Sequence, residues 1–213
     1  MSKKLIASLA VVLGIFAVAL GACGSDDDSA SSSSADAEEV DGTFIADMVP
    51  HHQSAIEMAE IAEKQADHPE IKQLASEIIA AQEMEIADLK AAHLRIFGEP
   101  LAEEDGSTEE HGGEVSEIDM TALENADPFD EAFIDMMIPH HQAAIEMARV
   151  ELSDGQDPEL MALAQQIIDS QSIEIEEMNS WREDWYGAVS PAGGVPPESE
   201  TASEDESMSS MEH

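Results

Sequence analysis

The chain has 213 residues, with 48 acidic side chains against 8 basic ones and a formal net charge of −40. Such a charge repels phosphate groups, so it excludes DNA and RNA as partners. The single cysteine excludes a disulfide within the chain.

The first 22 residues have the organisation of a bacterial export signal. Two lysines precede an apolar run from Leu5 to Leu20, and small residues then lead to Cys23. A cysteine directly after such a site resembles a lipoprotein signal, in which Cys23 is acylated. An ordinary secretory signal and a retained membrane helix are the alternatives. We expect residues 1–22 to be a signal peptide, and Cys23 to anchor the protein at the extracytoplasmic face of the cell membrane.

Polar segments flank a central region of globular composition. Residues 23–42 are rich in Ser and Asp, and residues 188–213 are rich in Pro, Gly, Ser and Glu. Because neither segment can bury enough apolar surface to form a core, we expect a disordered tether and a disordered acidic tail. The region between them, residues 43–187, has a suitable size for one domain.

Apolar residues at three- and four-residue spacing predict four long helices in the central region. Pro69 and Pro158 fit the first helical position, and Gly98 and Gly187 are suitable stop signals after the second and fourth helices. The predicted helices are Phe44–Ala66, Pro69–Phe97, Pro128–Leu152 and Pro158–Tyr186.

The central region is an internal duplication. Phe44–Ala59 and Phe133–Ala148 are near-copies with an offset of 89 residues, the separation of His51 and His140. This offset gives repeat one at 43–98, a polar crossover at 99–127 and repeat two at 128–187. A single helical hairpin cannot bury its apolar stripe alone. We therefore predict an all-α, ferritin-like four-helix bundle, made of two tandem helical hairpins related by pseudo-twofold symmetry.

Each first helix of a repeat combines adjacent histidines with methionines. Pro50 and Pro139 directly precede the histidine pairs and either kink these helices or mark their first turn. On a helical projection the second histidine and the preceding methionine share the apolar face. The duplication predicts two equivalent metal sites, one per repeat. The candidate metal ligands are Met48, His51, His52 and Met58 in repeat one and Met136, Met137, His140, His141, Met147 and Met178 in repeat two.

The second helices of the repeats place carboxyl and amide groups on their apolar faces. Glu85 and Gln82 share one such face, and Glu174 and Gln171 share the other, where Met178 joins them. A carboxylate on an apolar face is costly unless it is paired, protonated or bound to a metal. We expect Glu85 and Glu174 to accept from imidazole N–H groups of the first helices, or to be ligands themselves.

The ligand types favour a soft metal. Thioether sulfur suits Cu(I), and imidazole supports either oxidation state of copper, although another transition metal would fit in part. A histidine–glutamate network with a purely structural role is the alternative. A di-iron enzyme is a weaker interpretation, because only two carboxylates face the core and no Glu-x-x-His faces it with both side chains.

The block M-x-x-H-H-x-x-A-I-x-M-A, followed by Ile-Ile-x-x-Gln-x-x-Glu-Ile, resembles the bacterial domain-of-unknown-function-305 family over about 44–185. This resemblance implies a ferritin-like fold and export, and some members are periplasmic copper-binding proteins. The implied copper ligands are the motif methionines and histidines of both repeats. The halves differ at two positions, because Leu89 stands where repeat two has Met178, and Asp47 where it has Met136.

Together these observations predict a membrane-anchored extracytoplasmic lipoprotein that binds and buffers copper, most favourably Cu(I). Its partners would be the metal ion, the membrane through Cys23, and a protein that donates or accepts copper. No nucleophile with an activating base, phosphate loop or hydride-cofactor motif is visible, so we expect a binding protein and not an enzyme. A ferritin-like di-metal redox enzyme and a metal-free structural or interaction lipoprotein remain as alternatives.

Overall fold

The computed structural model describes residues 28–102 and 119–198, and every regular element in these ranges is an α-helix. The predicted all-α fold is confirmed. The expected signal peptide and Cys23 lie outside the described residues. The helices are α1 Asp28–Gln65, α2 Pro69–Phe97, α3 Met120–Glu124, α4 Phe129–Asp154 and α5 Pro158–Tyr186.

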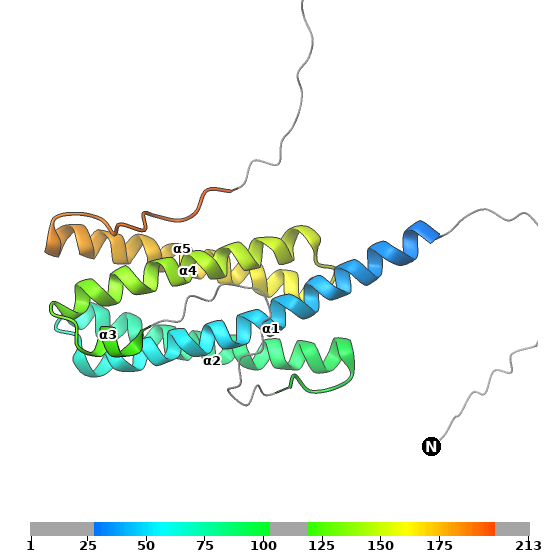
Figure 1. The fold of residues 1–213 in the computed structure, drawn as a ribbon, viewed down its shortest axis with the longest axis horizontal. Helices are drawn as coiled ribbons and strands as arrows, with labels where there is room; N and C mark the ends of the chain where they lie inside the picture. The colour runs from blue at the N-terminus through cyan, green and yellow to red at the C-terminus, as the bar shows by residue number, and fades with distance from the viewer. Residues whose placement is uncertain (1–27, 103–118, 199–213) are drawn as a thin grey trace, which may run out of the picture.

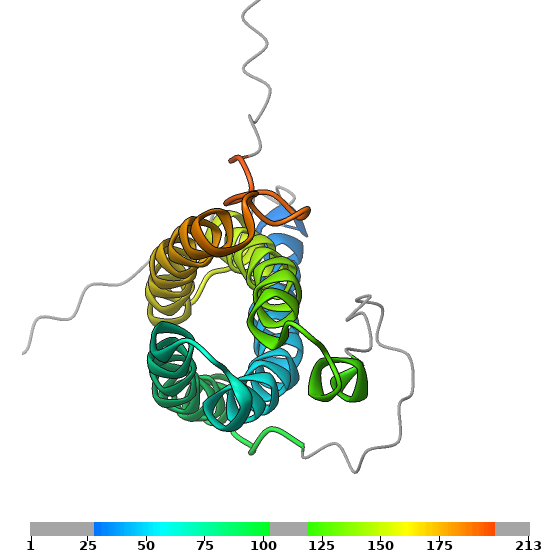
Figure 2. The ribbon, with the colours of Figure 1, turned by 90° about the vertical axis from the view of Figure 1, so that its left-hand side faces the viewer.

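The four long helices form one bundle around a common core (Figures 1 and 2). Helices α1 and α2 form one hairpin and α4 and α5 the other, and α1 runs antiparallel to α4 along their contact. The short helix α3 lies outside the ring of long helices, against α1 and α4 (Figure 2). In the described part of the chain, no helix has the length and apolar character needed to cross a membrane.

The ends of α2 and α5 agree with the sequence signals. Both helices begin with the predicted prolines and end at Gly98 and Gly187, whose φ angles of 77° and 86° are left-handed. Glycine adopts this conformation without the steric cost that a side chain brings. Asp157 caps α5 by accepting from the backbone N–H groups of Glu159 and Leu160.

The first helix is longer than predicted. It begins at Asp28 instead of Phe44, so the expectation of a disordered tether over residues 23–42 is wrong for residues 28–42. The small and acidic residues of this stretch include no proline that would stop a helix. Tertiary contacts also hold it in place, since Asp41 is buried and Gly42 lies under the ring of Phe97.

Two buried aspartates tie the hairpins together by a reciprocal exchange. Asp41 of α1 accepts from the backbone N–H of Gln156, ahead of α5, at 2.9 Å. Asp130 of α4 accepts from the backbone N–H groups of Asp67 at 3.0 Å and His68 at 2.9 Å, ahead of α2. These positions are related by the 89-residue offset. Each hairpin therefore supplies an aspartate that accepts from backbone N–H groups in the inter-helix turn of the other hairpin.

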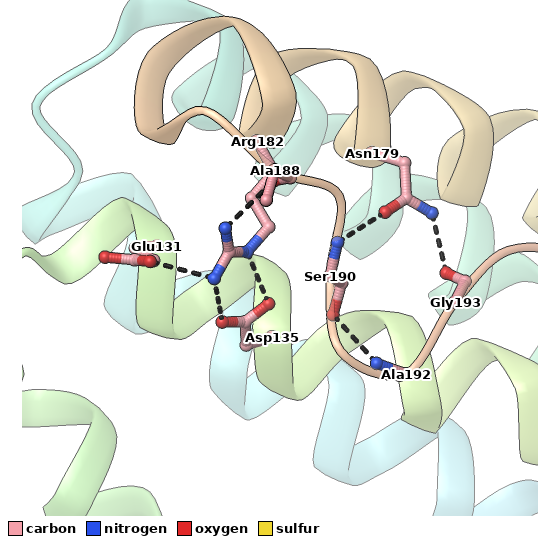
Figure 3. Close-up of polar contacts among 8 residues, drawn as sticks. All are labelled: Glu131, Asp135, Asn179, Arg182, Ala188, Ser190, Ala192 and Gly193. Carbon is pink, nitrogen blue, oxygen red and sulfur yellow. Dashed lines mark hydrogen bonds and ion pairs between the residues drawn. The ribbon is translucent and has the colours of Figure 1, made fainter.

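The residues after α5 form an ordered segment, here called the C-terminal strap, residues 188–198. It returns along α4 and α5, where Ser190 donates its backbone N–H to Asn179 Oδ1 at 2.8 Å and Asn179 donates to the Gly193 carbonyl at 2.7 Å (Figure 3). Arg149 of α4 donates to the Pro197 carbonyl at 2.9 Å. The expectation of disorder is thus wrong for these residues, because side chains of the bundle satisfy the strap's backbone groups.

A buried arginine fixes the start of the strap. Arg182 of α5 donates to both carboxylate oxygens of Asp135, at 2.8 and 2.9 Å, and to Glu131 at 2.8 Å (Figure 3). Its remaining nitrogen donates to the Ala188 carbonyl at 2.9 Å. A forked guanidinium can satisfy all of these acceptors at once, and the two carboxylates compensate its charge.

Candidate metal centre

The two histidine pairs lie where α1 and α4 meet at the centre of the bundle. Both helices continue through their prolines, so Pro50 and Pro139 mark neither helix start. Both prolines are exposed, whereas His51, His52, His140 and His141 are buried. The antiparallel packing of α1 on α4 thus brings the two repeated motifs against each other.

The four imidazoles form a continuous row across the bundle. The rings of His51 and His140 face one another, with centroids 3.7 Å apart and planes tilted by 34°. The ring centroid of His52 lies 6.3 Å from that of His51, and the centroid of His141 lies 6.4 Å from that of His140. The repeats therefore do not form two remote sites. They meet in one histidine layer.

The outer two imidazoles contact the carboxylates predicted from the sequence. His141 Nε2 lies 2.6 Å from Glu174 Oε2 and donates a hydrogen bond to it. His52 Nε2 lies 2.8 Å from Glu85 Oε2, but its N–H is not aligned with that oxygen, so the contact is an ion-pair distance without a hydrogen bond. The two histidine–glutamate contacts thus occupy equivalent positions in the two repeats, but only the contact in repeat two is a hydrogen bond.

Ser54 determines the tautomer of His140. The Ser54 hydroxyl donates to the His51 carbonyl at 2.8 Å and also lies 2.8 Å from His140 Nε2. Since the single hydroxyl proton is used on the carbonyl, His140 Nε2 must carry the proton and donate to Ser54 Oγ. The other nitrogen, His140 Nδ1, is then a bare acceptor.

Each of the four imidazoles has a buried nitrogen without a hydrogen-bond partner. The atom is Nδ1 in every case. In His141, as in His140, the hydrogen bond made by Nε2 leaves Nδ1 as a lone pair. A buried polar atom without a partner costs about 1–3 kcal/mol, and its repetition in all four rings calls for an explanation. A lone pair on neutral imidazole is the donor that a soft or borderline metal ion uses.

The central imidazoles are neutral at physiological pH. Burial, reinforced by the neighbouring imidazoles of His52 and His141, lowers the pKa of His51 to about 3. Burial and the facing ring of His51 hold the pKa of His140 well below its ordinary value. An incoming cation therefore has no proton to displace from either ring.

The methionines lie in two layers, one on each side of the histidine row, and each layer draws on both repeats. Met48 of repeat one packs in the same apolar cluster as Met147 of repeat two. Met58 of repeat one packs in the other cluster with Met137, together with Met136 and Met178 of repeat two. Each layer thus combines thioethers from both repeats, so neither repeat forms a complete layer by itself.

Other features of the centre constrain its chemistry. Gln82 and Gln171 are buried beside this region, and their Oε1 atoms lack hydrogen-bond partners. Across the described residues, no three His, Cys, Asp or Glu side chains converge on a single point. A metal held here would need thioether sulfur in its coordination, which favours a soft ion over a hard one.

Sequence reasoning missed Ser54 and the central ring contact, and it also missed the two aspartate caps at the turns of the hairpins. Ser54 has Ala143 as its counterpart, so a search for repeated residues excludes it. The ring contact of His51 with His140 depends on how α1 crosses α4, which periodicity does not specify. The caps Asp41 and Asp130 were detectable, because both occur at the 89-residue offset ahead of the histidine pairs.

Comparison with known families matches the model described as "Domain of unknown function (DUF305)" over residues 41–182, with a second match over 130–213. The chain belongs to the DUF305 family. Among curated proteins, "Uncharacterized protein L153" of Acanthamoeba polyphaga mimivirus is 45% identical over 51 residues, which is 24% of this chain. The chain matches only 34% of that protein's length.

Solved structures that are similar to this chain include copper-bound forms of another protein. CopM in the Cu(I)-bound form is 42% identical, with a TM-score of 0.61 over 69% of this chain and 98% of that chain. CopM was also solved in Cu(II)-bound and Ag-bound forms. A putative secreted DUF305 protein from Streptomyces coelicolor, at 23% identity, has the same fold with a TM-score of 0.60 over 72% of this chain and 98% of that chain.

Proposed function

We propose that this protein binds copper ions, preferentially Cu(I), in the histidine and methionine layers between α1 and α4. It would buffer copper or pass it to a partner protein outside the cytoplasm. The observation that carries the proposal is the set of four buried Nδ1 atoms without partners. The solved CopM forms support it, since a protein with 42% identity was obtained with Cu(I).

The mechanism follows from the ligand geometry. Glu174 holds the proton of His141 on Nε2, and Ser54 does the same for His140, so both Nδ1 atoms are presented as donors. Thioethers from both repeats, Met48 and Met147 in one layer and Met58 and Met137 in the other, would supply the remaining ligands of a bound ion. Because methionine does not titrate and resists loss to disulfides, such ligands remain competent outside the cytosol.

An anaerobic Cu(I) titration against a chromophoric chelator tests the proposal. The variant Met48→Leu with Met147→Leu removes one thioether layer, so about half of the bound Cu(I) should be lost. The variant Met48→Leu with Met58→Leu removes one thioether from each layer and should weaken both. The matched control Met84→Leu changes a methionine that is 64% exposed on α2 and should leave the stoichiometry unchanged.

Replacement of all four motif histidines by asparagine provides the decisive comparison. The proposal requires that this variant lose Cu(I) binding while far-ultraviolet circular dichroism shows the helices intact. Full Cu(I) stoichiometry in a folded quadruple variant would reject the site and favour a structural histidine–glutamate network.

Anchoring at the membrane is a separate part of the proposal. Cys23 is the only cysteine and follows the expected signal peptide directly. In a bacterial host, the wild-type chain should incorporate radiolabelled palmitate and sediment with membranes, and Cys23→Ser should abolish the labelling. Equal labelling of both chains would contradict the lipoprotein assignment without affecting the copper site.

A further inference from the structure

A groove lies between α1 and α4 on the side where the N-terminal part of α1 projects beyond the other helices (Figure 1). It has a volume of about 410 Å³ and extends along α1 from Asp36 to Asp47. Phe44 and Val40 contribute apolar surface from α1, and Val150 contributes it from α4. Val150 is 52% exposed, which is unusual for a valine beside such a depression.

The pseudo-twofold counterpart of this groove is filled. Applying the 89-residue offset to Val40, Phe44 and Val150 gives Phe129, Phe133 and Ile61, which belong to or pack against one apolar cluster. Helix α3 covers that cluster, because Leu123 is fully buried in it and Met120 packs against it. The same architecture thus has a short amphipathic helix in one half and a groove in the other.

The difference arises from the path of the chain ahead of each repeat. Helix α3, Met120–Glu124, is separated from α4 by a break and folds against the bundle. Its counterparts at the 89-residue offset are residues 31–35, and these continue α1 without a break. Repeat one therefore supplies no short helix of its own, and its groove is left for another occupant.

The groove differs from its counterpart in charge. The carboxylates of Asp36, Glu39 and Asp47 contribute to its walls, and no lysine or arginine lines it. Glu151 also lines the groove and replaces the buried Ala62 of repeat one. Burial and the nearby charge of Asp41 raise the pKa of Glu151 to about 8, so the charge of the groove comes mainly from the other three carboxylates. An occupant that matches this surface would be apolar on one side and positively charged at its edges.

The chain itself offers no basic segment to fill the groove. Residues 103–118 and 199–213 contain several acidic residues and no lysine or arginine. The same holds for residues 23–27, after removal of the expected signal peptide. A second copy of the chain would bring another net charge of −40. Charge therefore disfavours both self-occupancy and a homodimer across this face.

We propose that this groove is the docking site for a partner protein, which inserts a short amphipathic helix bearing basic residues beside a leucine or methionine. The helix would occupy the place that α3 takes in the other half, with its apolar side chains between Phe44 and Val150. Its lysines or arginines would lie against Asp36 and Glu39. This inference does not depend on copper binding.

Fluorescence anisotropy with a labelled synthetic peptide tests the proposal. The probe carries the Met-Thr-Ala-Leu sequence of α3 flanked by lysines, and the reference is a peptide of identical composition with scrambled order. The patterned peptide should bind the full mature chain at least about tenfold more tightly than the scrambled one at about 0.15 M salt, where nonspecific attraction is reduced. Equal binding of both peptides would overturn the proposal.

Substitutions at the rim locate the binding. Val150→Asp should abolish binding of the patterned peptide without reducing the negative charge, whereas Ile173→Asp, at a residue 58% exposed on α5, should leave it intact. Glu39→Lys should weaken binding more than Glu83→Lys on α2. Unchanged binding in Val150→Asp would reject this location. Self-association of the wild-type chain in sedimentation, lost in Val150→Asp, would show that a second copy covers the groove and would also overturn the proposal.

Discussion

Two imidazoles of the central row are oriented by neighbouring side chains that would not themselves bind the metal ion. Ser54 contacts His140, and Glu174 contacts His141, and each acts on the Nε2 atom. The opposite nitrogen is thereby fixed as a lone pair inside the core. Such orienting partners typically contribute 10- to 100-fold to metal affinity (roughly, across metal sites).

Replacement of Ser54 by alanine should therefore weaken Cu(I) binding by about tenfold, because His140 can then adopt either tautomer. The effect should appear in a chelator competition titration, with little change in thermal stability. The exposed Ser76 on α2 provides the control, since Ser76→Ala removes a hydroxyl at a distance from the histidines. Equal affinity of both variants would remove Ser54 from the site.

The buried imidazoles should also make folding sensitive to acid. In the unfolded chain His51 has an ordinary pKa of 6.5, while burial lowers the folded-state pKa to about 3. Between these values the unfolded state binds a proton that the folded state does not. The free energy of unfolding that depends on this group is thus fully present above pH 6.5 and is lost progressively as the pH falls toward 3.

Urea denaturation at pH 7, 6 and 5 measures this dependence. The double variant His51→Gln with His140→Gln cannot take up these protons, so its free energy of unfolding should fall less steeply with acid than that of the wild type. The comparison is needed because protonation of the many carboxylates acts in the opposite direction, by relieving repulsion. Parallel pH profiles for the two proteins would contradict the assignment.

At the scale of helices, the reciprocal caps are unequal. Asp130 accepts from two backbone N–H groups and also contacts His68 Nδ1 at 2.6 Å, and the His68 ring stacks on Trp185 at 3.7 Å. Asp41 accepts from Gln156 and Asp157, but it lies in a region where Glu151 is also buried. Burial, reinforced by the charge of Asp41, raises the pKa of Glu151 to about 8.

Substitution of the two caps should reveal this inequality. Asp41→Ala removes the acceptor of two backbone N–H groups but also a charge beside Glu151, so it should cost about 1 kcal/mol of unfolding free energy. Asp130→Ala should cost about 2–3 kcal/mol, because it removes the acceptor of two backbone N–H groups and also the partner of the His68 ring. Urea titrations at pH 7 measure both values, and a larger cost for Asp41→Ala would contradict the expected order.

Helix periodicity and the duplication predicted most of this element-level organisation. Three of the four predicted helices both begin and end within two residues of their observed bounds. The terminal signals at Pro69, Pro158, Gly98 and Gly187 are confirmed. The extension of α1 to Asp28 was not predicted, because Ser, Ala and Asp have weak preferences that tertiary contacts override. Helix α3 was too short to give a periodic signal.

Helical spacing predicted two contacts within the candidate site, whereas its metal ligands stay a prediction. The carboxylates Glu85 and Glu174 were placed opposite the histidines by helical spacing, and their contacts with His52 and His141 are present. Two separate ligand sets, one per repeat, also followed from the duplication. The structure brings them into one row, because the antiparallel crossing of α1 on α4 is a long-range property that local sequence does not encode.

For the molecule as a whole, charge repulsion opposes compaction. A formal net charge of −40 on 213 residues destabilises the folded state, since its carboxylates lie closer together there than in the unfolded chain. Raising NaCl from about 10 mM to about 1 M shortens the Debye length from about 30 Å to about 3 Å. The thermal midpoint should therefore rise by several degrees, as measured by circular dichroism. A midpoint that falls with NaCl would show that ion pairs such as that of Arg95 with Asp157 dominate.

The exchange of aspartates between hairpins bears on how such a protein can be divided. A fragment that contains only repeat one keeps Asp41 but lacks the backbone N–H of Gln156, from which Asp41 accepts. In the same fragment, the backbone N–H of His68 loses its acceptor Asp130. Two identical fragments could recover both contacts only by pairing about a twofold axis, so that the Asp41 of each fragment caps the turn of the other. The smallest autonomous unit of this architecture is consequently a pair of hairpins, whether they are joined by a linker or supplied as separate polypeptides.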